Sequence, residues 1–199
     1  MSSTIGVQNI AHTNGTVAAT VDSGGNIAMA SGKTFSGGGK VLQVKYFQLT
    51  TSQTETYPTA NTDQAISNFV VNITPNSTSS IMKIEANVMY ESANAAWDTM
   101  WFFYRDTTKL GNTQSSPGSR QLGISPGLDN YNQGNNDSTP EFATLTYFDV
   151  PSTTSAINYK LAVRTNSASN FFINRTVNDN DSSGYERGVS FISVTEIGG

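Results

Sequence analysis

The sequence predicts an all-β protein: an antiparallel, jelly-roll-like β-sandwich head that follows a short N-terminal segment. The dominant apolar period is two, and clusters of Ser, Asn, Gly and Pro separate the alternating runs as turns. No segment keeps an apolar period of 3.6 over three turns. With 199 residues, of which 36% are hydrophobic, the chain can bury one ordinary core. We therefore expect one main domain with an appendage.

Residues 1–38 form the appendage. They contain short strand-like runs of small side chains, separated by Asn-Gly and Gly-Gly turns. Each run has only two or three small or β-branched residues in alternation, as in Val17, Ala19 and Val21. Such short pieces are marginal alone in water. Identical copies of the chain wound about a common axis would supply the missing partners. The segment is therefore predicted to be a short trimeric β shaft or attachment segment; a polar arm that docks onto another protein is the alternative.

The head is expected at 39–199, and its clearest strand is 81–90. Met82, Ile84, Ala86, Val88 and Tyr90 alternate there with the polar Lys83, Glu85 and Asn87, as in a half-buried antiparallel strand. Seven similar runs predict further strands at 41–49, 66–73, 99–105, 142–150, 158–165, 170–176 and 188–197. The longest irregular region is 106–140, within which 120–124 is the candidate for one more short strand.

Composition excludes several classes of function. The net charge is -4 and the eleven basic residues are scattered, so no nucleic-acid partner is expected. The absence of Cys removes thiol chemistry, disulfides and most structural zinc sites. Without a signal peptide or a run of 18 apolar residues, the chain is expected to be made in the cytoplasm and not to insert into a membrane.

Several stretches carry a resemblance: "TIGVQNIAHTNGTVAATVDSGGNI", "SGKTFSGGGKVLQV", "NFVVNITPNSTSSIMKIEANVMYES", "INYKLAVRTNSASNFFINRT" and "GVSFISVTEI". Together they resemble tail-fibre or minor structural proteins of bacteriophages, especially marine phages. The likeness is strongest at 38–105 and 157–197, and 106–140 matches no motif. The resemblance implies a homotrimeric fibre in the virion, with an N-terminal part that faces other virion proteins and a β-sandwich head that contacts the host.

The sequence predicts no catalytic residue, metal or cofactor. The single histidine, His12, lies in the N-terminal segment, and the sequence indicates no Ser and Asp beside it to complete a catalytic triad. The stretch 179–184 is similar to the start of a calcium loop, but Ser190 stands where a bidentate Glu is needed, which favours a polar turn. A glycosidase needs two converging carboxylates, and nothing in the sequence shows that any of the available ones converge. These are Asp98, Asp106, Asp129, Asp137 and Glu141.

Two groups remain as binding candidates. Trp97 and Trp101 lie in the heaviest aromatic stretch, 97–105, and are expected either to pack against the core and a subunit interface or to form a stacking platform for sugar rings. In the long irregular region, an aromatic side chain and several amide side chains cluster between two glycines. Such side chains can stack on sugar rings and hydrogen-bond to polar groups, which favours receptor binding. The members of this cluster are Asp129, Asn130, Tyr131, Asn132 and Gln133. An ordinary solvated turn, or a loop that contributes to the trimer interface, is the alternative.

The sequence thus favours a phage fibre protein, not an enzyme, that recognises a host-surface glycan or outer-membrane protein as a homotrimer. A capsid-attached head fibre or decoration protein is the main alternative, and a polysaccharide depolymerase is the third.

Overall fold

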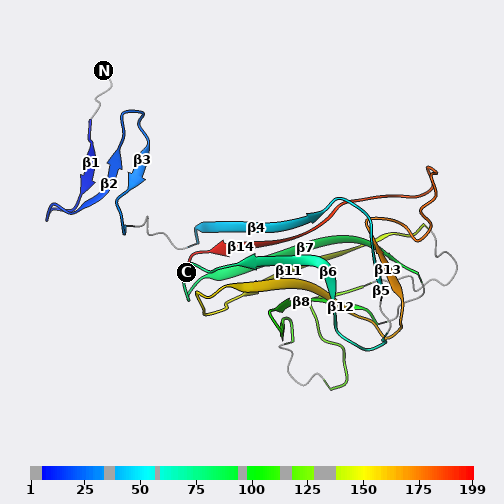
Figure 1. Cartoon of the computed structure of the whole chain (residues 1–199). Helices are drawn as coiled ribbons and strands as arrows, with labels where there is room; N and C mark the ends of the chain where they lie inside the picture. The colour runs from blue at the N-terminus through cyan, green and yellow to red at the C-terminus, as the bar shows by residue number, and fades with distance from the viewer. Residues whose placement is uncertain (1–5, 34–38, 57–58, 94–97, 113–117, 128–137) are drawn as a thin grey trace. The chain divides into compact units, whose positions relative to one another are not determined.

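The computed structural model describes residues 6–33, 39–56, 59–93, 98–112, 118–127 and 138–199 (Figure 1). Its contacts divide the chain into two compact units, Met1–Gly38 and Gly39–Gly199. All regular secondary structure in the described residues is β, and the sheets are antiparallel. The predicted all-β, sandwich-type fold is therefore confirmed.

The N-terminal unit is a three-stranded antiparallel sheet of β1 (Asn9–Ala11), β2 (Val17–Val21) and β3 (Ile27–Met29). Its turns form as the sequence indicates: Gly15 has a left-handed φ of 84°, and the Asp22 side chain accepts hydrogen bonds from the amides of Gly24 and Asn26. Ala19 is the one buried residue among those described in this unit. The sheet consequently has almost no core of its own.

Two sheets form the head. We call the first the β7 sheet; its order is β4, β14, β7, β11, with β13 and β5 continuing beside the far end of β7. The second, the β12 sheet, has the order β10, β8, β12, β6, with β9 paired to β8. The strands of the β7 sheet are β4 (Val41–Leu49), β5 (Gln53–Thr56), β7 (Ile81–Ser92), β11 (Glu141–Asp149), β13 (Asn170–Ile173) and β14 (Ser190–Ile197). Those of the β12 sheet are β6 (Gln64–Ile73), β8 (Met100–Arg105), β9 (Thr108–Lys109), β10 (Ser125–Pro126) and β12 (Ile157–Arg164).

All eight strands expected in the head are present, and no strand end is shifted by more than three residues. The candidate strand at 120–124 is wrong: the short strand in that region is β10, which pairs Ser125 with Trp101 and Pro126 with Met100. The preceding Gly123 lies so close to β8 that an added Cβ would stand 2.3 Å from the Met100 side chain. Only a residue without a side chain lets the segment approach β8 in this way.

Strand β7 pairs along one side with two collinear strands, β13 near its end and β14 near its start. Between them, residues 174–189 leave the sheet and return. Asn174 begins this excursion at a φ of 61°, and its amide donates hydrogen bonds to the carbonyls of Leu49 and Thr51. Arg175 and Arg187 close the excursion with an isolated β-bridge. The predicted polar turn at 179–184 lies within it.

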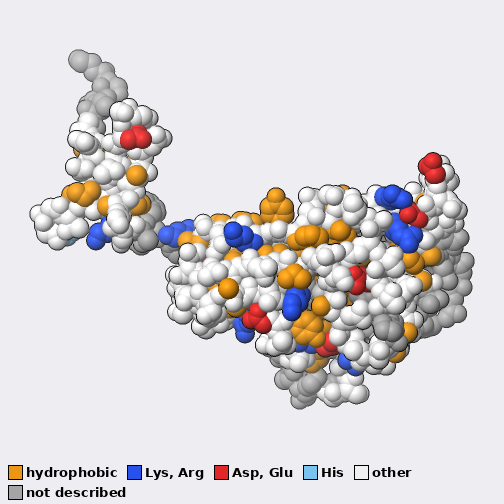
Figure 2. All heavy atoms as spheres, in the orientation of Figure 1, with side chains coloured by type: hydrophobic (Ala, Val, Ile, Leu, Met, Phe, Trp, Pro, Cys, Tyr) orange, Lys and Arg blue, Asp and Glu red, His pale blue; other side chains and the backbone are white. Residues whose placement is uncertain are grey.

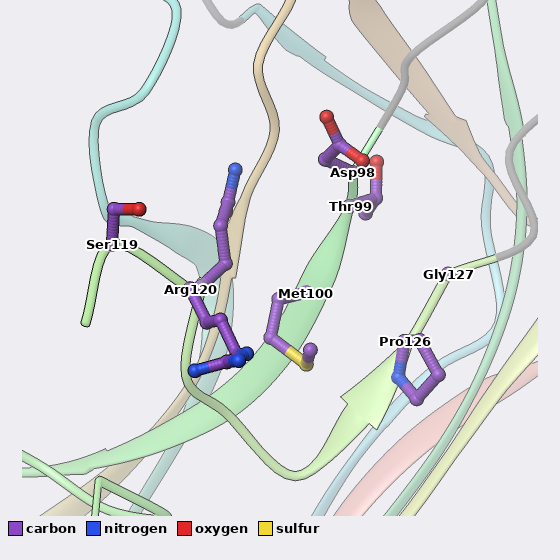
Figure 3. A pocket seen from close by; sticks show the side chains of 8 residues that line it. Asp98, Thr99, Met100, Ser119, Arg120, Pro126 and Gly127 are labelled. Atoms are coloured by element: carbon purple, nitrogen blue, oxygen red, sulfur yellow. The ribbon is translucent and has the colours of Figure 1, made fainter. Parts of the chain in front are cut away.

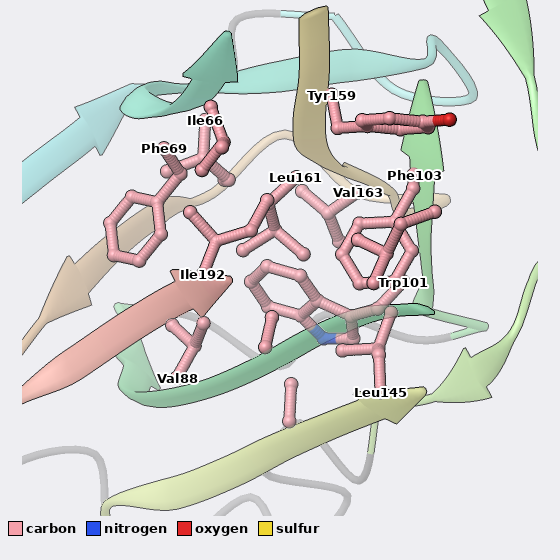
Figure 4. Close-up of a cluster of buried hydrophobic side chains, with 14 of the residues drawn as sticks. Ile66, Phe69, Val88, Trp101, Phe103, Leu145, Tyr159, Leu161, Val163 and Ile192 are labelled. Atoms are coloured by element: carbon pink, nitrogen blue, oxygen red, sulfur yellow. The ribbon is translucent and has the colours of Figure 1, made fainter. Parts of the chain in front are cut away.

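The core lies between the two sheets (Figure 4). Inward residues of β7 alternate with outward ones as the sequence predicts: Val88 is fully buried, whereas Lys83 and Glu85 form a half-buried ion pair of 2.8 Å on the outer face. From the other sheet, Trp101 packs against Tyr90 and Phe171, with ring centroids 4.9 and 5.9 Å apart. Aromatic packing therefore joins the sheets at the centre of the sandwich.

Three buried carboxylates attach the surrounding segments to this core. Glu55 on β5 accepts hydrogen bonds from Ser67 of β6, next to a bulge at Asn68, where φ is 66°. Glu91 at the end of β7 accepts from the backbone amides of Thr139 and Val177. Among the described residues, neutral amides and hydroxyls donate hydrogen bonds to these carboxylates. These bonds offset the cost of removing the charged groups from water.

Glu196 on β14 is the third buried carboxylate and the most heavily bonded. It accepts 2.6 Å hydrogen bonds from the Ser80 hydroxyl, the Gln43 amide and the Asn76 backbone amide. Burial by itself raises the pKa of Glu196, but the bonds from Ser80, Gln43 and Asn76 favour the charged form and hold the pKa below its usual value. This carboxylate thus joins β4 and β14 to the connection that follows β6.

We expect Val88→Asp to abolish soluble, folded protein, because an unpaired charge in the core costs about 3 kcal/mol or more. Asn87→Asp, one residue away on the outer face, should shift the unfolding midpoint only slightly. Thermal unfolding of both variants, followed by circular dichroism, provides the comparison. Equal effects would contradict the strand register described above.

We expect Glu196→Gln to destabilise the head by about 2 kcal/mol at neutral pH, because the charged acceptor is lost. The folded pKa of Glu196 lies below its unfolded value, so its stabilisation is full above the unfolded pKa and declines as pH falls through the folded pKa. The difference in melting temperature between wild type and variant should therefore shrink below about pH 4. A difference that stays constant down to acid pH would contradict the assignment.

Candidate functional site

The head has two distinct ends. At one end, which we call the base, the backbone amide of Gly39 bonds to Gly198 and that of Gly198 to Lys40, so the first and last residues of the head lie together. At the opposite end, which we call the loop end, Asp63 precedes β6, Asp98 precedes β8 and Gly127 follows β10. Figure 1 shows these two ends at opposite extremes of the long strands.

A cationic hollow of about 390 Å³ lies beside the loop end on the outer side of the β12 sheet. Asp63 accepts from Lys109 at 3.1 Å and from Arg164 at 3.2 Å, and the side chain of Arg120 lines the same hollow. Three cations thus face one carboxylate in a chain whose net charge is -4. Such a lining favours an anionic group, since guanidinium groups bind carboxylates and sulfates in two-point geometry.

Aromatic side chains support this hollow from below. Phe102, which faces away from the core, is nevertheless fully buried, and the Lys109 ammonium lies 3.9 Å from its ring centroid. Burial raises the pKa of the neighbouring Tyr104 hydroxyl, and the charge and hydrogen bonding of Asp63 raise it further, while Arg164 opposes the shift. Both outward aromatics of β8 are therefore used to position charged groups.

A second hollow of about 530 Å³ lies on the other side of Ser119, Arg120 and Gln121, which line both (Figure 3). Met100, Pro126 and Gly127 line its apolar side, and Asp98 its acidic side. Asp98 has a left-handed φ of 54° and accepts a hydrogen bond from Asn166 at 2.9 Å. Residues 119–121 therefore border both a cationic hollow and a partly apolar one.

Most of the predicted binding residues fall outside the described structure. Asp129, Asn130, Tyr131, Asn132 and Gln133 lie outside the described residues, as does Trp97. Trp101 is described and is wholly buried between the sheets, so it presents no face to a sugar or to another subunit. Nothing in the sequence pointed to Asp63, Lys109 and Arg164, because the topology alone brings these three distant positions together.

The described carboxylates considered for hydrolysis are Asp98, Asp106 and Glu141. Asp98 and Asp106 lie at the two ends of β8, roughly 25 Å apart at 3.3 Å per residue. Asp106 accepts hydrogen bonds from Asn158 at the base, whereas Glu141 accepts one from the Tyr90 hydroxyl. Asp129 and Asp137 lie outside the described residues. Asp98 and Asp106 are therefore too far apart to act as a glycosidase pair.

Asp179, in the acidic turn at 179–184, forms an ion pair with Arg187. Arg187 donates to both carboxylate oxygens of Asp179, at 2.9 and 2.7 Å, and these hydrogen bonds lower the pKa of Asp179. Among the described residues, no three His, Cys, Asp or Glu side chains are grouped so as to hold a metal ion. Nor does any helix in that part of the chain have the length and apolarity to cross a membrane.

Comparison with known proteins gives matches among solved structures only. No protein-family model matches the chain, and no curated protein matches it by sequence. A solved structure of infectious bursal disease virus, Gx strain, is similar with a TM-score of 0.36 and 10% identity, over 86% of this chain and 42% of that one. The chain therefore spans less than half the length of the protein it matches.

Proposed function

We propose that this chain is a fibre-type structural protein of a bacteriophage virion that assembles as a homotrimer and contacts the host surface with its head. The observation that carries the proposal is the N-terminal unit: Ile10 and Ile27, on a sheet of three short strands, are 46% and 66% exposed, and Val7, which precedes β1, is 51% exposed. Such a sheet needs partners to be stable in water. Equivalent sheets of identical chains are the simplest partners, and the sequence resemblance to phage fibre proteins supports the same assembly.

The two ends of the head support the division of roles. The N-terminal unit joins the head at its base, and the two hollows border the opposite, loop end. Loops on a rigid sandwich are the usual place for binding groups. In this proposal the base attaches to the virion and the loop end faces the host. The cationic hollow suits a glycan that carries carboxylate or sulfate groups.

Weak single sites are sufficient for such a role. Three heads on one fibre, and several fibres on a particle, raise the effective affinity without any tight individual contact. An open hollow of about 390 Å³ fits one or two sugar rings at most, as expected for a site that acts through repetition.

The assembly is tested by sedimentation of the full-length chain, which should behave as a trimer of three 21.3 kDa subunits. Ile27→Lys places a charge on the exposed apolar side of the N-terminal sheet and should lower assembly at least tenfold, as expected for a desolvated charge. Thr20→Lys, a charge on an exposed polar side chain of the opposite face of the same sheet, is the matched control. A monomer at micromolar concentration would overturn the proposal.

Host recognition is tested by binding of the trimer to susceptible cells. Arg120→Gln combined with Arg164→Gln should lower binding by about tenfold, because each head loses two charge-assisted contacts. Tyr131→Ala combined with Asn132→Ala tests the residues that the sequence favours, and Lys40→Gln with Lys45→Gln removes two charges from β4 and the base. If neither the Arg120 and Arg164 pair nor the Tyr131 and Asn132 pair differs from the β4 control while thermal stability is unchanged, neither group of residues contacts the receptor.

A further inference from the structure

The outer face of the β7 sheet carries an unusual set of exposed apolar side chains. Register places outward residues of β4, β14, β7 and β11 side by side: Tyr46 pairs with Ser193, which pairs with Glu85, which pairs with Thr146. Hydrophobic side chains are visible on the surface of the head in Figure 2. Those that register assigns to this face, or that directly follow β11, are Val41, Val44, Tyr46, Phe142, Phe148, Val150 and Phe191.

These side chains form two strips on the one face. The first, which we call the β4 strip, comprises Val41, Val44 and Tyr46 with Phe191 of β14; the second, the β11 strip, comprises Phe142, Phe148 and Val150. Strands β4 and β11 are three strand spacings apart, or roughly 14 Å. Serine and threonine hydroxyls and the Lys83–Glu85 ion pair separate the strips.

The exposed aromatic area on this face equals that of the largest apolar patch on a typical monomer, and such patches are often functional. Tyr46, Phe142 and Phe148 are 72%, 61% and 58% exposed. At about 200 Å² per aromatic side chain, these three and Phe191 expose roughly 450 Å², before the three valines are added. The largest apolar patch on a typical monomer is about 300–600 Å², and one side of a standard interface buries about 800 Å². Each strip carries about half of this aromatic area, so one strip supplies roughly a quarter of one side of a standard interface, before the valines are counted.

We propose that this face is the contact between heads in the oligomer, with the β4 strip of one copy packed on the β11 strip of the next. The inference rests on the proposed homotrimer and adds the surface that forms it. A closed ring of three uses two different patches on each chain, and the face provides two. The ion pair between Lys83 and Glu85 on this face has no net charge, so the pair adds no net repulsion between copies.

Single-cysteine variants of the full-length chain test the contact, because the natural chain has no Cys. Gln48→Cys on β4 and Thr146→Cys on β11 lie on the outer face without removing a strip residue; Ser182→Cys, on the exposed turn of the excursion, is the control. In the assembled protein, both face positions should react with a maleimide at least tenfold more slowly than the control. Equal rates in a protein that sediments as a trimer would overturn this inference and leave the proposed trimer intact.

Crosslinking then tests which strips meet. When Gln48→Cys and Thr146→Cys chains are assembled together and oxidised, a covalent dimer should form that contains one chain of each kind. Each chain has a single thiol, so any disulfide must join two copies. Crosslinks within one kind of chain only would overturn the strip-to-strip arrangement, and a monomer in sedimentation would overturn both this inference and the proposed trimer.

Charge substitutions complete the test without relying on thiols. Phe148→Lys should raise the protein concentration needed for half-assembly at least tenfold, whereas Thr154→Lys, at an exposed position outside both strips, should leave it unchanged. The fold of each variant is checked by its melting temperature. Normal assembly of a folded Phe148→Lys variant would overturn the inference.

Discussion

The register of β7 is the constraint on which the head depends. This twelve-residue strand pairs with β11 on one side and with both β13 and β14 on the other, so three other strands take their positions from it. Its inward residues build one wall of the core, and its outward residues form the polar centre of the face between the two apolar strips. A shift by one residue would exchange these sets. The hydrophobic alternation in 81–90 therefore fixes both the interior and the surface proposed for assembly.

Buried carboxylates hold the remaining connections to this frame. Glu55, Glu91 and Glu196 each accept hydrogen bonds from a loop or a neighbouring strand that packing alone would leave loosely placed. Each carboxylate can take several donors at once, so one side chain fixes several backbone groups. This arrangement suits a sequence in which only 13% of residues are charged and neutral amides and hydroxyls are abundant.

Alternating strands could be predicted from the sequence because burial on one side imposes a period of two, as in β7, β11 and β14. Strand β5, with the sequence Gln-Thr-Glu-Thr, was not predicted because its inward residue is the hydrogen-bonded Glu55 and not an apolar side chain.

The cationic hollow was not predicted for another reason. Asp63, Lys109 and Arg164 are 46 to 101 residues apart, and only strand order brings them together. The aromatic stretch was informative about packing, since Trp101 and Phe102 point to opposite sides of β8 and both are buried.

The pairing of the first and last strands of the head also determines how the head carries force. Strand β4 begins at the base and runs toward the loop end, and its ladder with β14 extends from Val41 to Leu49. A pull between the base and the loop end acts along these strands. The hydrogen bonds of the ladder are then loaded together in shear, and no single bond at one end bears the tension first. The head is thus built to resist stretching along its long axis more strongly than peeling of β4 sideways from its edge.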